Sequence, residues 1–321
     1  MSQLVSLKLK NVNLDSSISF GEFKVSYQQF GQDLTLNPVV LIIHPLTGNS
    51  NVSGSDGWWN KIVKPGGAID TEKFSILAFN IPGNGYDGTI FKNYKEFNTG
   101  DIAKIFYSAL KELKIKNIYA AIGGSIGASI CWEIAALYPK LIKHLIPVAG
   151  DWKSSDWMIA NTSLQSKILQ HSSNPIEDAR MHAMLCYRTP KSFKLRFNRS
   201  FNNEQGVHNV ESWLAHHGEK LKERFELKAY KMMNHLLGSI NIERYGKSFE
   251  QIIVEIESKI HIISIDTDLF FPLDEDVTTV KIADSLGVKI DHKIICSDYG
   301  HDAFLMEFEK VDIFLKEIFK S

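Results

Sequence analysis

The pentapeptide GGSIG at residues 123–127 has the pattern of a serine nucleophile. It follows an apolar run over residues 117–122 and precedes an expected helix over residues 128–137. A strand that turns sharply into a helix needs glycines beside the serine, because side chains there would collide. The turn places the serine hydroxyl at the helix N-terminus, where free N–H groups favour developing negative charge. We therefore predict that Ser125 is a nucleophile.

A serine is a weak nucleophile at neutral pH and needs a base that a third group orients. The sequence offers Asp268 and His301, each just past an expected strand end, where α/β sheets gather their catalytic groups. Together with Ser125 they would form a triad for acyl transfer. The alternatives are structural: the glycine-rich turn could lack chemistry, and Asp268 could cap a helix or lie in a solvated loop.

Short apolar runs rich in β-branched residues alternate with amphipathic stretches along the chain. Such runs are typical of parallel strands that are buried on both faces. The expected strands are residues 39–45, 74–81, 117–122, 141–149, 260–265 and 289–296. The expected helices that accompany them are residues 101–113, 128–137, 274–286 and a closing helix over 303–319. This alternation predicts an α/β fold with a mostly parallel sheet.

Two further segments depart from the alternation. Residues 6–14 and 23–31 alternate polar and apolar side chains, which predicts an antiparallel hairpin at a sheet edge with its turn near residues 20–22. Between residues 151 and 255 the strand pattern disappears, and helices are expected over 174–186 and 211–227. We therefore expect one elaborated domain. Its core would comprise residues 1–150 and 256–321, and residues 151–255 would form an inserted helical lid.

Composition narrows the class of protein. The 321 residues include 36 basic and 37 acidic side chains, so no excess of charge indicates nucleic acid or an anionic membrane as a partner. No segment approaches the roughly 18 apolar residues of a membrane span, and the first residues lack the pattern of a secretion signal. Cys131, Cys186 and Cys296 show no metal-binding or paired spacing. These features predict a cytoplasmic protein with reduced cysteines.

Short motifs stand in a characteristic order along the chain. They are HPLTG (44–48), GWW (57–59), PGGAIDT (65–71), GGSIG (123–127), YRT (187–189), VESWL (210–214), DLFFP (268–272) and YGHDAFL (299–305). In sequence and order they resemble motifs of the homoserine O-acetyltransferase family, which has the α/β-hydrolase fold. The heptad at residues 299–305 is the most specific, since a generic hydrolase fixes little there beyond the histidine.

The resemblance implies a mechanism in two steps. Acetyl-CoA, a co-substrate and not a bound cofactor, would acylate Ser125 while His301 takes the proton and Asp268 orients the imidazole. The backbone N–H groups of Leu46 and Ile126 would form the oxyanion hole. The hydroxyl of homoserine would then attack the acyl-enzyme, a step of methionine biosynthesis. No metal ion is expected.

The resemblance also implies how the amino acid binds and how the chain assembles. Arg188 would bind the carboxylate of homoserine, for which a guanidinium has suitable geometry, and Asp302 would bind the ammonium group. Without the resemblance, Arg188 would be interpreted as part of a salt bridge in the lid. The family likeness further implies a homodimer formed through the inserted helices.

The chain departs from the family pattern near the site. Residues 84–90 replace a glycine-cysteine loop, Trp213 replaces a tyrosine, and residues 215–217 are AHH in place of RYQ. The preferences for donor and acceptor therefore stay open between acetyl and succinyl groups and between homoserine and serine. An esterase or thioesterase would use the same triad, and a binding protein without catalysis is the remaining alternative.

Overall fold

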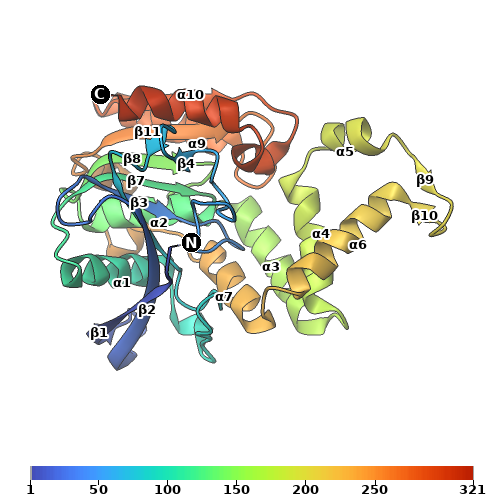
Figure 1. Cartoon of the computed structure of the whole chain (residues 1–321), viewed down its shortest axis with the longest axis horizontal. Coiled ribbons are helices and arrows are strands. Elements are labelled where there is room, and N and C mark those ends of the chain that lie inside the picture. Colours follow the sequence, from blue (N-terminus) through green and yellow to red (C-terminus); the bar gives the residue numbers. More distant parts are fainter. Residues whose placement is uncertain (1, 321) are drawn as a thin grey trace.

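A computed structural model describes residues 2–320 and contains an eight-stranded sheet in the order β1-β2-β6-β3-β7-β8-β11-β12. The six strands from β6 to β12 in this order run parallel, whereas β1 and β2 form an antiparallel edge (Figure 1). The strands are β1 Val5–Asn13, β2 Ser19–Gly31, β3 Val39–Ile43, β6 Ser75–Phe79, β7 Ile118–Gly124, β8 Ile142–Val148, β11 Lys259–Ile265 and β12 Ile290–Ile295. The predicted α/β class and mostly parallel sheet are confirmed.

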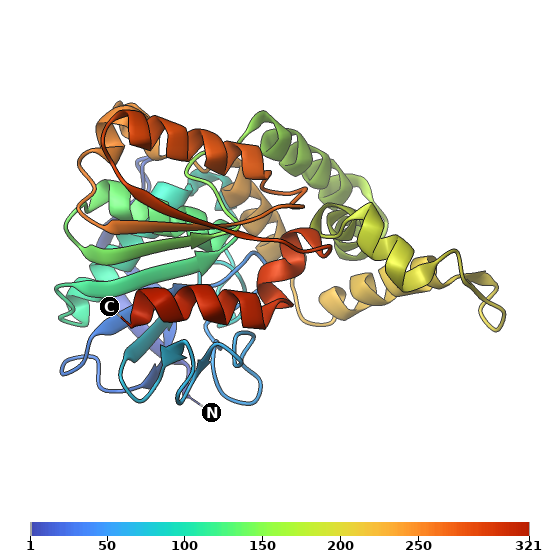
Figure 2. The same cartoon turned by 90° about the horizontal axis from the view of Figure 1, so that it is seen from above.

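Helices cover both faces of this sheet (Figure 2). Helix α10 (Phe308–Phe319) packs on one face, beside the short strands β4 (Val63–Lys64) and β5 (Ile69–Asp70). The opposite face is covered by α1 (Thr99–Glu112), α2 (Ile126–Leu137) and α9 (Leu273–Ser285). Side chains alternate between the faces along each strand. In β3, for example, Leu41 and Val40 are both fully buried but belong to different apolar clusters.

The segment between β8 and β11 is mainly helical and extends away from the sheet in both views (Figures 1 and 2). Its helices are α3 Asp156–His171, α4 Pro175–Tyr187, α5 Pro190–Phe197, α6 Asn209–Lys222, α7 Leu227–Gly238 and α8 Phe249–Ile253. A two-stranded hairpin, β9 (Phe201–Asn202) with β10 (Val207–His208), lies at its far end and was not predicted. The sequence between these two strands is polar and too short to produce a strand pattern.

Three predicted boundaries were wrong. The register pairs Val12 with Phe20, so residues 20–22 lie within β2 and the hairpin turns at residues 14–18. The helix expected over 211–227 stops at Lys222, and the turn that follows lets Phe225 bury beside Tyr230, with ring centroids 6.1 Å apart. The closing helix is divided into a 3₁₀ segment, η3 (Gly300–Leu305), and α10.

A buried ion pair fastens the inserted segment to the helix that follows the expected nucleophile. Glu133 of α2 is fully buried, and its carboxylate lies 2.5 Å from Nη1 of Arg244 in the 3₁₀ segment η2 (Ile242–Tyr245). The hydroxyl of Thr99, at the start of α1, donates to the same carboxylate oxygen at 2.6 Å. This cluster therefore joins α1, α2 and η2 through one carboxylate.

Replacing Arg244 with methionine is expected to lower the free energy of unfolding by about 3–5 kcal/mol, because it leaves the Glu133 charge buried and unpaired. Urea denaturation followed by circular dichroism would measure the loss. The matched control is Lys247→Met, which breaks the exposed Lys247–Glu255 pair and should cost at most about 1 kcal/mol. Equal losses in the two variants would contradict the stabilising role of the buried pair.

Candidate active site

Ser125 is the single residue between the end of β7 and the start of α2. Its backbone has φ 58° and ψ −128°, a conformation that a non-glycine residue rarely adopts and that marks a strained turn. A side chain on Gly123 would collide with the backbone of Gly127, and one on Gly127 would collide with the carbonyl of Ile43. The two glycines therefore permit the sharp strand-to-helix turn that places the Ser125 hydroxyl at the N-terminus of α2, where the residue is 3% exposed.

His301 and Asp268 lie together at the carboxyl ends of the neighbouring strands β11 and β12. Nδ1 of His301 is 2.7 Å from Oδ2 of Asp268, and both side chains are almost fully buried. The other carboxylate oxygen, Oδ1, accepts hydrogen bonds from the backbone N–H groups of Phe270 at 2.7 Å and Phe271 at 2.9 Å. These bonds orient the carboxylate, so the proton of the neutral imidazole lies on Nδ1 and Nε2 is the basic atom.

The ring of Phe304 links the imidazole to the serine turn. Its centroid is 5.5 Å from that of the His301 ring, and a side chain on Gly124 would collide with it. Three more aromatic rings have centroids 5.5, 5.1 and 5.6 Å from the imidazole centroid; they are Tyr187, Phe270 and Phe271. This apolar surrounding excludes water and strengthens electrostatic interactions inside the site.

The two expected oxyanion donors approach the serine from different segments. Ile126 is the first residue of α2, where a backbone N–H has no partner within the helix. Leu46 belongs to the loop that follows β3, and this loop begins against the start of α2 because Gly127 has no side chain to separate them. The fold therefore brings both segments to the serine turn.

Arg188 and Asp302 form an ion pair directly beside the imidazole. Nε of Arg188 is 3.0 Å from Oδ2 of Asp302, and the two side chains are only 11% and 18% exposed. Burial raises the pKa of Asp302, and the Arg188 charge counteracts this shift. The guanidinium also lies 5.2 Å from the ring centroid of Tyr299. Among residues 2–320, Nε of Arg188 is buried and makes no hydrogen bond of good geometry, so its contact with Asp302 is an ion pair only.

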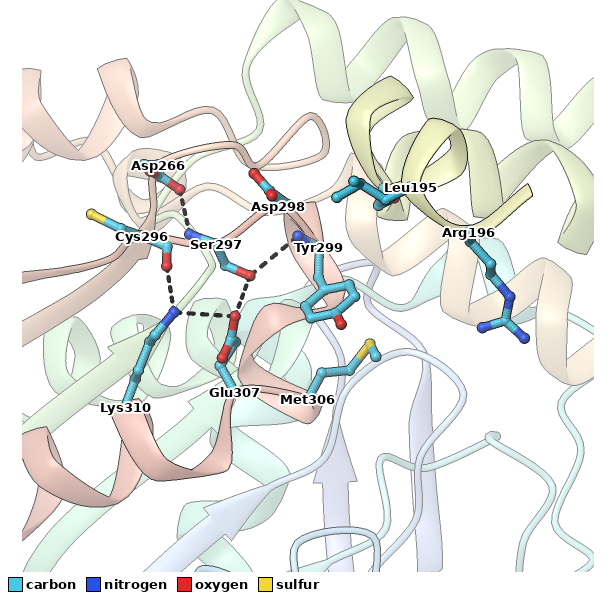
Figure 3. Close-up of a pocket in the computed structure, with 11 residues that line it drawn as sticks. Leu195, Arg196, Asp266, Cys296, Ser297, Asp298, Tyr299, Met306, Glu307 and Lys310 are labelled. Atoms are coloured by element: carbon cyan, nitrogen blue, oxygen red, sulfur yellow. Dashed lines mark hydrogen bonds and ion pairs between the residues drawn. The ribbon is translucent and has the colours of Figure 1, made fainter. Parts of the chain in front are cut away.

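A cavity of about 560 Å³ is lined by residues that directly precede His301 in the chain, among them Ser297, Asp298 and Tyr299 (Figure 3). Ser297 is the central group of this segment: its hydroxyl donates to Glu307 at 2.8 Å and accepts the N–H of Tyr299 at 3.1 Å. Lys310 pairs with Glu307 at 3.1 Å and donates to the carbonyl of Cys296 (Figure 3). These bonds hold the segment that leads from β12 to His301.

Sequence reasoning did not single out Arg224, which contacts the loop of Leu46. Its Nη1 donates to the carbonyl of Thr47 at 2.8 Å and so connects the turn between α6 and α7 to this loop. No local pattern distinguishes Arg224 from other arginines of the inserted segment, since only the fold brings it to this loop.

Within residues 2–320, no group of three or more histidine, cysteine or acidic side chains could hold a metal ion. No helix in the same range is long and apolar enough to cross a membrane.

Comparisons with known proteins concern the fold and the sequence family. A family model described as alpha/beta hydrolase fold matches residues 38–173. Homoserine O-acetyltransferases from Symbiobacterium thermophilum and Nautilia profundicola are each 28% identical; the alignments cover 95% and 97% of this chain and 92% and 96% of theirs. Among solved structures, a homoserine O-acetyltransferase from Bacillus anthracis superposes with a TM-score of 0.89 at 16% identity, covering 100% of this chain and 98% of that one. Esterase E22 gives 0.88 at 17% identity, covering 99% and 100%. The chain therefore has the α/β-hydrolase fold and, as its motifs predicted, is similar in sequence to homoserine O-acetyltransferases over nearly its whole length.

Proposed function

We propose that this protein transfers an acetyl group from acetyl-CoA, through an acyl-enzyme on Ser125, to the hydroxyl of L-homoserine. The observation that carries the proposal is the Arg188–Asp302 ion pair beside the His301–Asp268 pair, because it supplies a fixed cation and a fixed anion where an acceptor must bind. Similarity to homoserine O-acetyltransferases along 95% of the chain supports the same substrates. Such a transfer belongs to methionine biosynthesis.

Acylation begins with the Ser125 hydroxyl. Nε2 of His301 removes the hydroxyl proton as the oxygen attacks the thioester carbonyl, and Asp268 stabilises the imidazolium that forms. The amides of Leu46 and Ile126 stabilise the oxyanion of the tetrahedral intermediate. When the intermediate collapses, His301 donates the proton to the departing thiolate, so coenzyme A leaves as a thiol and Ser125 carries the acetyl group.

Transfer repeats these steps with homoserine as the nucleophile. Its carboxylate binds the Arg188 guanidinium and its ammonium group binds Asp302, so the amino acid inserts between two charges that otherwise pair with each other. His301 removes the proton of the homoserine hydroxyl, which attacks the acetyl carbonyl, and then returns the proton to Ser125. Water would be the competing nucleophile, and the aromatic rings around His301 limit its access.

Replacing Asp302 with asparagine is expected to lower kcat/KM for homoserine about ten- to a hundredfold, because charge-assisted hydrogen bonds contribute roughly 1.5–3 kcal/mol. Release of free thiol from acetyl-CoA in a single turnover should change far less. Both half-reactions are measured across pH, since the substitution also removes a negative charge next to His301.

The matched control is Asp298→Asn, which lies in the same loop and pairs with Lys191 at the surface. It should leave both half-reactions unchanged. If homoserine does not accelerate deacylation of the wild-type enzyme, the acceptor assignment is wrong and a serine esterase or thioesterase becomes the better description. An Asp302→Asn enzyme that responds to homoserine as wild type does would reject the ammonium site alone.

Assembly and location are part of the same proposal. Exposed apolar side chains on α3 and α4, among them Trp157, Leu164 and Leu185, support a homodimer formed through the inserted helices. Sedimentation velocity should find a dimer, and Leu164→Asp together with Leu185→Asp should shift the equilibrium towards the monomer. A wild-type monomer at micromolar concentration would refute the proposed dimer.

The unpaired state of Cys131, Cys186 and Cys296 supports a cytoplasmic location.

A further inference from the structure

The loop that carries Leu46, residues 45–48, is referred to below as the oxyanion loop. The residue directly before this loop is His44, whose ring is fully buried. Nδ1 of His44 lies 2.8 Å from the carbonyl of Pro45, and Nε2 accepts the backbone N–H of Ile81 at 2.9 Å. A backbone N–H can only donate, so Nε2 must be unprotonated and Nδ1 must carry the proton. Burial lowers the pKa of His44 to about 4, which keeps this neutral form at physiological pH.

Asn84 makes the second contact to the same ring nitrogen. Its Nδ2 donates to Nε2 of His44 at 3.1 Å, and its Oδ1 accepts the backbone N–H of Tyr86 at 3.1 Å. The Tyr86 bond fixes which end of the amide is oxygen, so the donor end faces His44. The same Nδ2 lies 3.5 Å from the carbonyl of Gly48. One buried amide therefore reaches both the residue before the oxyanion loop and its last residue.

The segment that carries Asn84 is itself held in place. Asn80 accepts the backbone N–H of Ser50 at 2.8 Å and donates to the Ser50 hydroxyl at 3.0 Å, just beyond the oxyanion loop. A side chain on Gly83 would collide with Met232 of α7, so the inserted helices pack directly behind the segment. Asn84 thus lies on a segment that contacts of Asn80 and Gly83 hold in place.

We propose that Asn84 is a positioning residue for catalysis: it holds the His44 ring and the end of the oxyanion loop in place, so that the Leu46 amide points at the developing oxyanion. The inference rests on the proposed acyl-enzyme mechanism. Asn84 lies in the segment, residues 84–90, where this chain departs from the glycine-cysteine loop of the family it resembles. The contact of Asn84 with His44 and the oxyanion loop therefore depends on this chain's own sequence.

A loosened oxyanion loop has a specific kinetic consequence. Loss of one oxyanion donor typically lowers kcat by 10²–10³-fold, and a displacement of about 1 Å can cost 10²-fold. Homoserine binds to Arg188 and Asp302, which lie on other segments, so its KM should stay unchanged. An Asn84 variant should therefore lose kcat about ten- to a hundredfold without losing affinity for the acceptor.

The experiment uses the full chain and two probes that do not depend on the natural acyl donor. The burst of nitrophenol from p-nitrophenyl acetate reports acylation of Ser125, and the dissociation constant of phenylboronic acid reports stabilisation of a tetrahedral adduct. Both are measured for Asn84→Ala and for the isosteric Asn84→Asp, which places an acceptor where His44 needs a donor. We expect the burst rate to fall at least about tenfold and boronate binding to weaken in parallel.

Asn234→Ala is the matched control, because Asn234 is equally buried, at 3% exposure, and donates to the carbonyl of Thr162 at 2.9 Å away from the triad. It should lower the Tm as Asn84→Ala does but leave both probes unchanged. A normal burst rate and normal boronate affinity in the Asn84 variants would overturn the positioning role. If Asn84→Ala does not fold, the isosteric Asn84→Asp decides. A wild-type burst without thiol release from acetyl-CoA would refute the proposed donor but not the role of Asn84.

Discussion

Replacing Ser125 with alanine is expected to lower turnover with acetyl-CoA and homoserine by at least about 10⁴-fold, because the variant lacks the atom that becomes acylated. The fold should survive, since the hydroxyl caps no helix and alanine accommodates the turn as serine does. Steady-state assays of free thiol and of the product ester would measure the loss. Intact-protein mass spectrometry should detect an acetyl adduct on the wild-type chain and none on the variant.

Ser129→Ala provides the control for this result. Ser129 lies one turn further along α2, is fully buried, and its hydroxyl oxygen has no hydrogen-bond partner within residues 2–320. Removing this hydroxyl should leave turnover close to wild type. Turnover of Ser125→Ala within about tenfold of wild type, or a comparable loss in Ser129→Ala, would contradict the assignment of the nucleophile.

The core of the fold was predictable because its strands are buried on both faces. A strand such as β3 must be apolar at every position, so it appears in the sequence as an uninterrupted β-branched run with clear ends. The serine turn was predictable for a related reason: Gly123 and Gly127 are each required by a backbone contact that leaves no room for a side chain. These signals are local, and one sequence is enough to detect them.

The helix boundaries that were predicted wrongly depend on tertiary contacts. Nothing near Phe225 in the sequence indicates that a helix must stop there, since the break serves to bury its ring beside Tyr230. The division of the closing helix likewise depends on Glu307, which binds Ser297 ten residues earlier. Helical propensity continues through both breaks, so the sequence predicts longer helices than the structure contains.

The residues of the candidate site can be divided in the same way, into those with a local sequence signal and those placed only by tertiary contacts. Asp268 and His301 could be predicted because each follows an expected strand. Arg188 could not be separated from the other arginines of the inserted segment without the family resemblance, and its position over Asp302 follows from the packing of α4 against η3. The contact between Asn84 and His44 joins residues 40 positions apart through a single hydrogen bond, which leaves no periodic pattern to detect.

Replacing Asp268 with asparagine is expected to lower kcat by about 10⁴-fold through a change of imidazole tautomer. Oδ1 of Asp268 accepts two backbone N–H groups, from Phe270 and Phe271, so the oxygen of an asparagine amide must take that place. The NH₂ group then faces His301 and can only donate, which forces Nδ1 to accept and moves the proton to Nε2. The atom that should deprotonate Ser125 would already carry a proton.

Nitrogen chemical shifts of the His301 ring would report the tautomer, and single-turnover thiol release would report the rate. The control is Asp266→Asn, two residues earlier, where the carboxylate accepts the backbone N–H of Ser297 and an amide oxygen can do the same. That variant should stay within a few-fold of wild type. If Asp268→Asn keeps the wild-type rate, or if its loss occurs with Nδ1 still protonated, Asp268 does not act by fixing the tautomer.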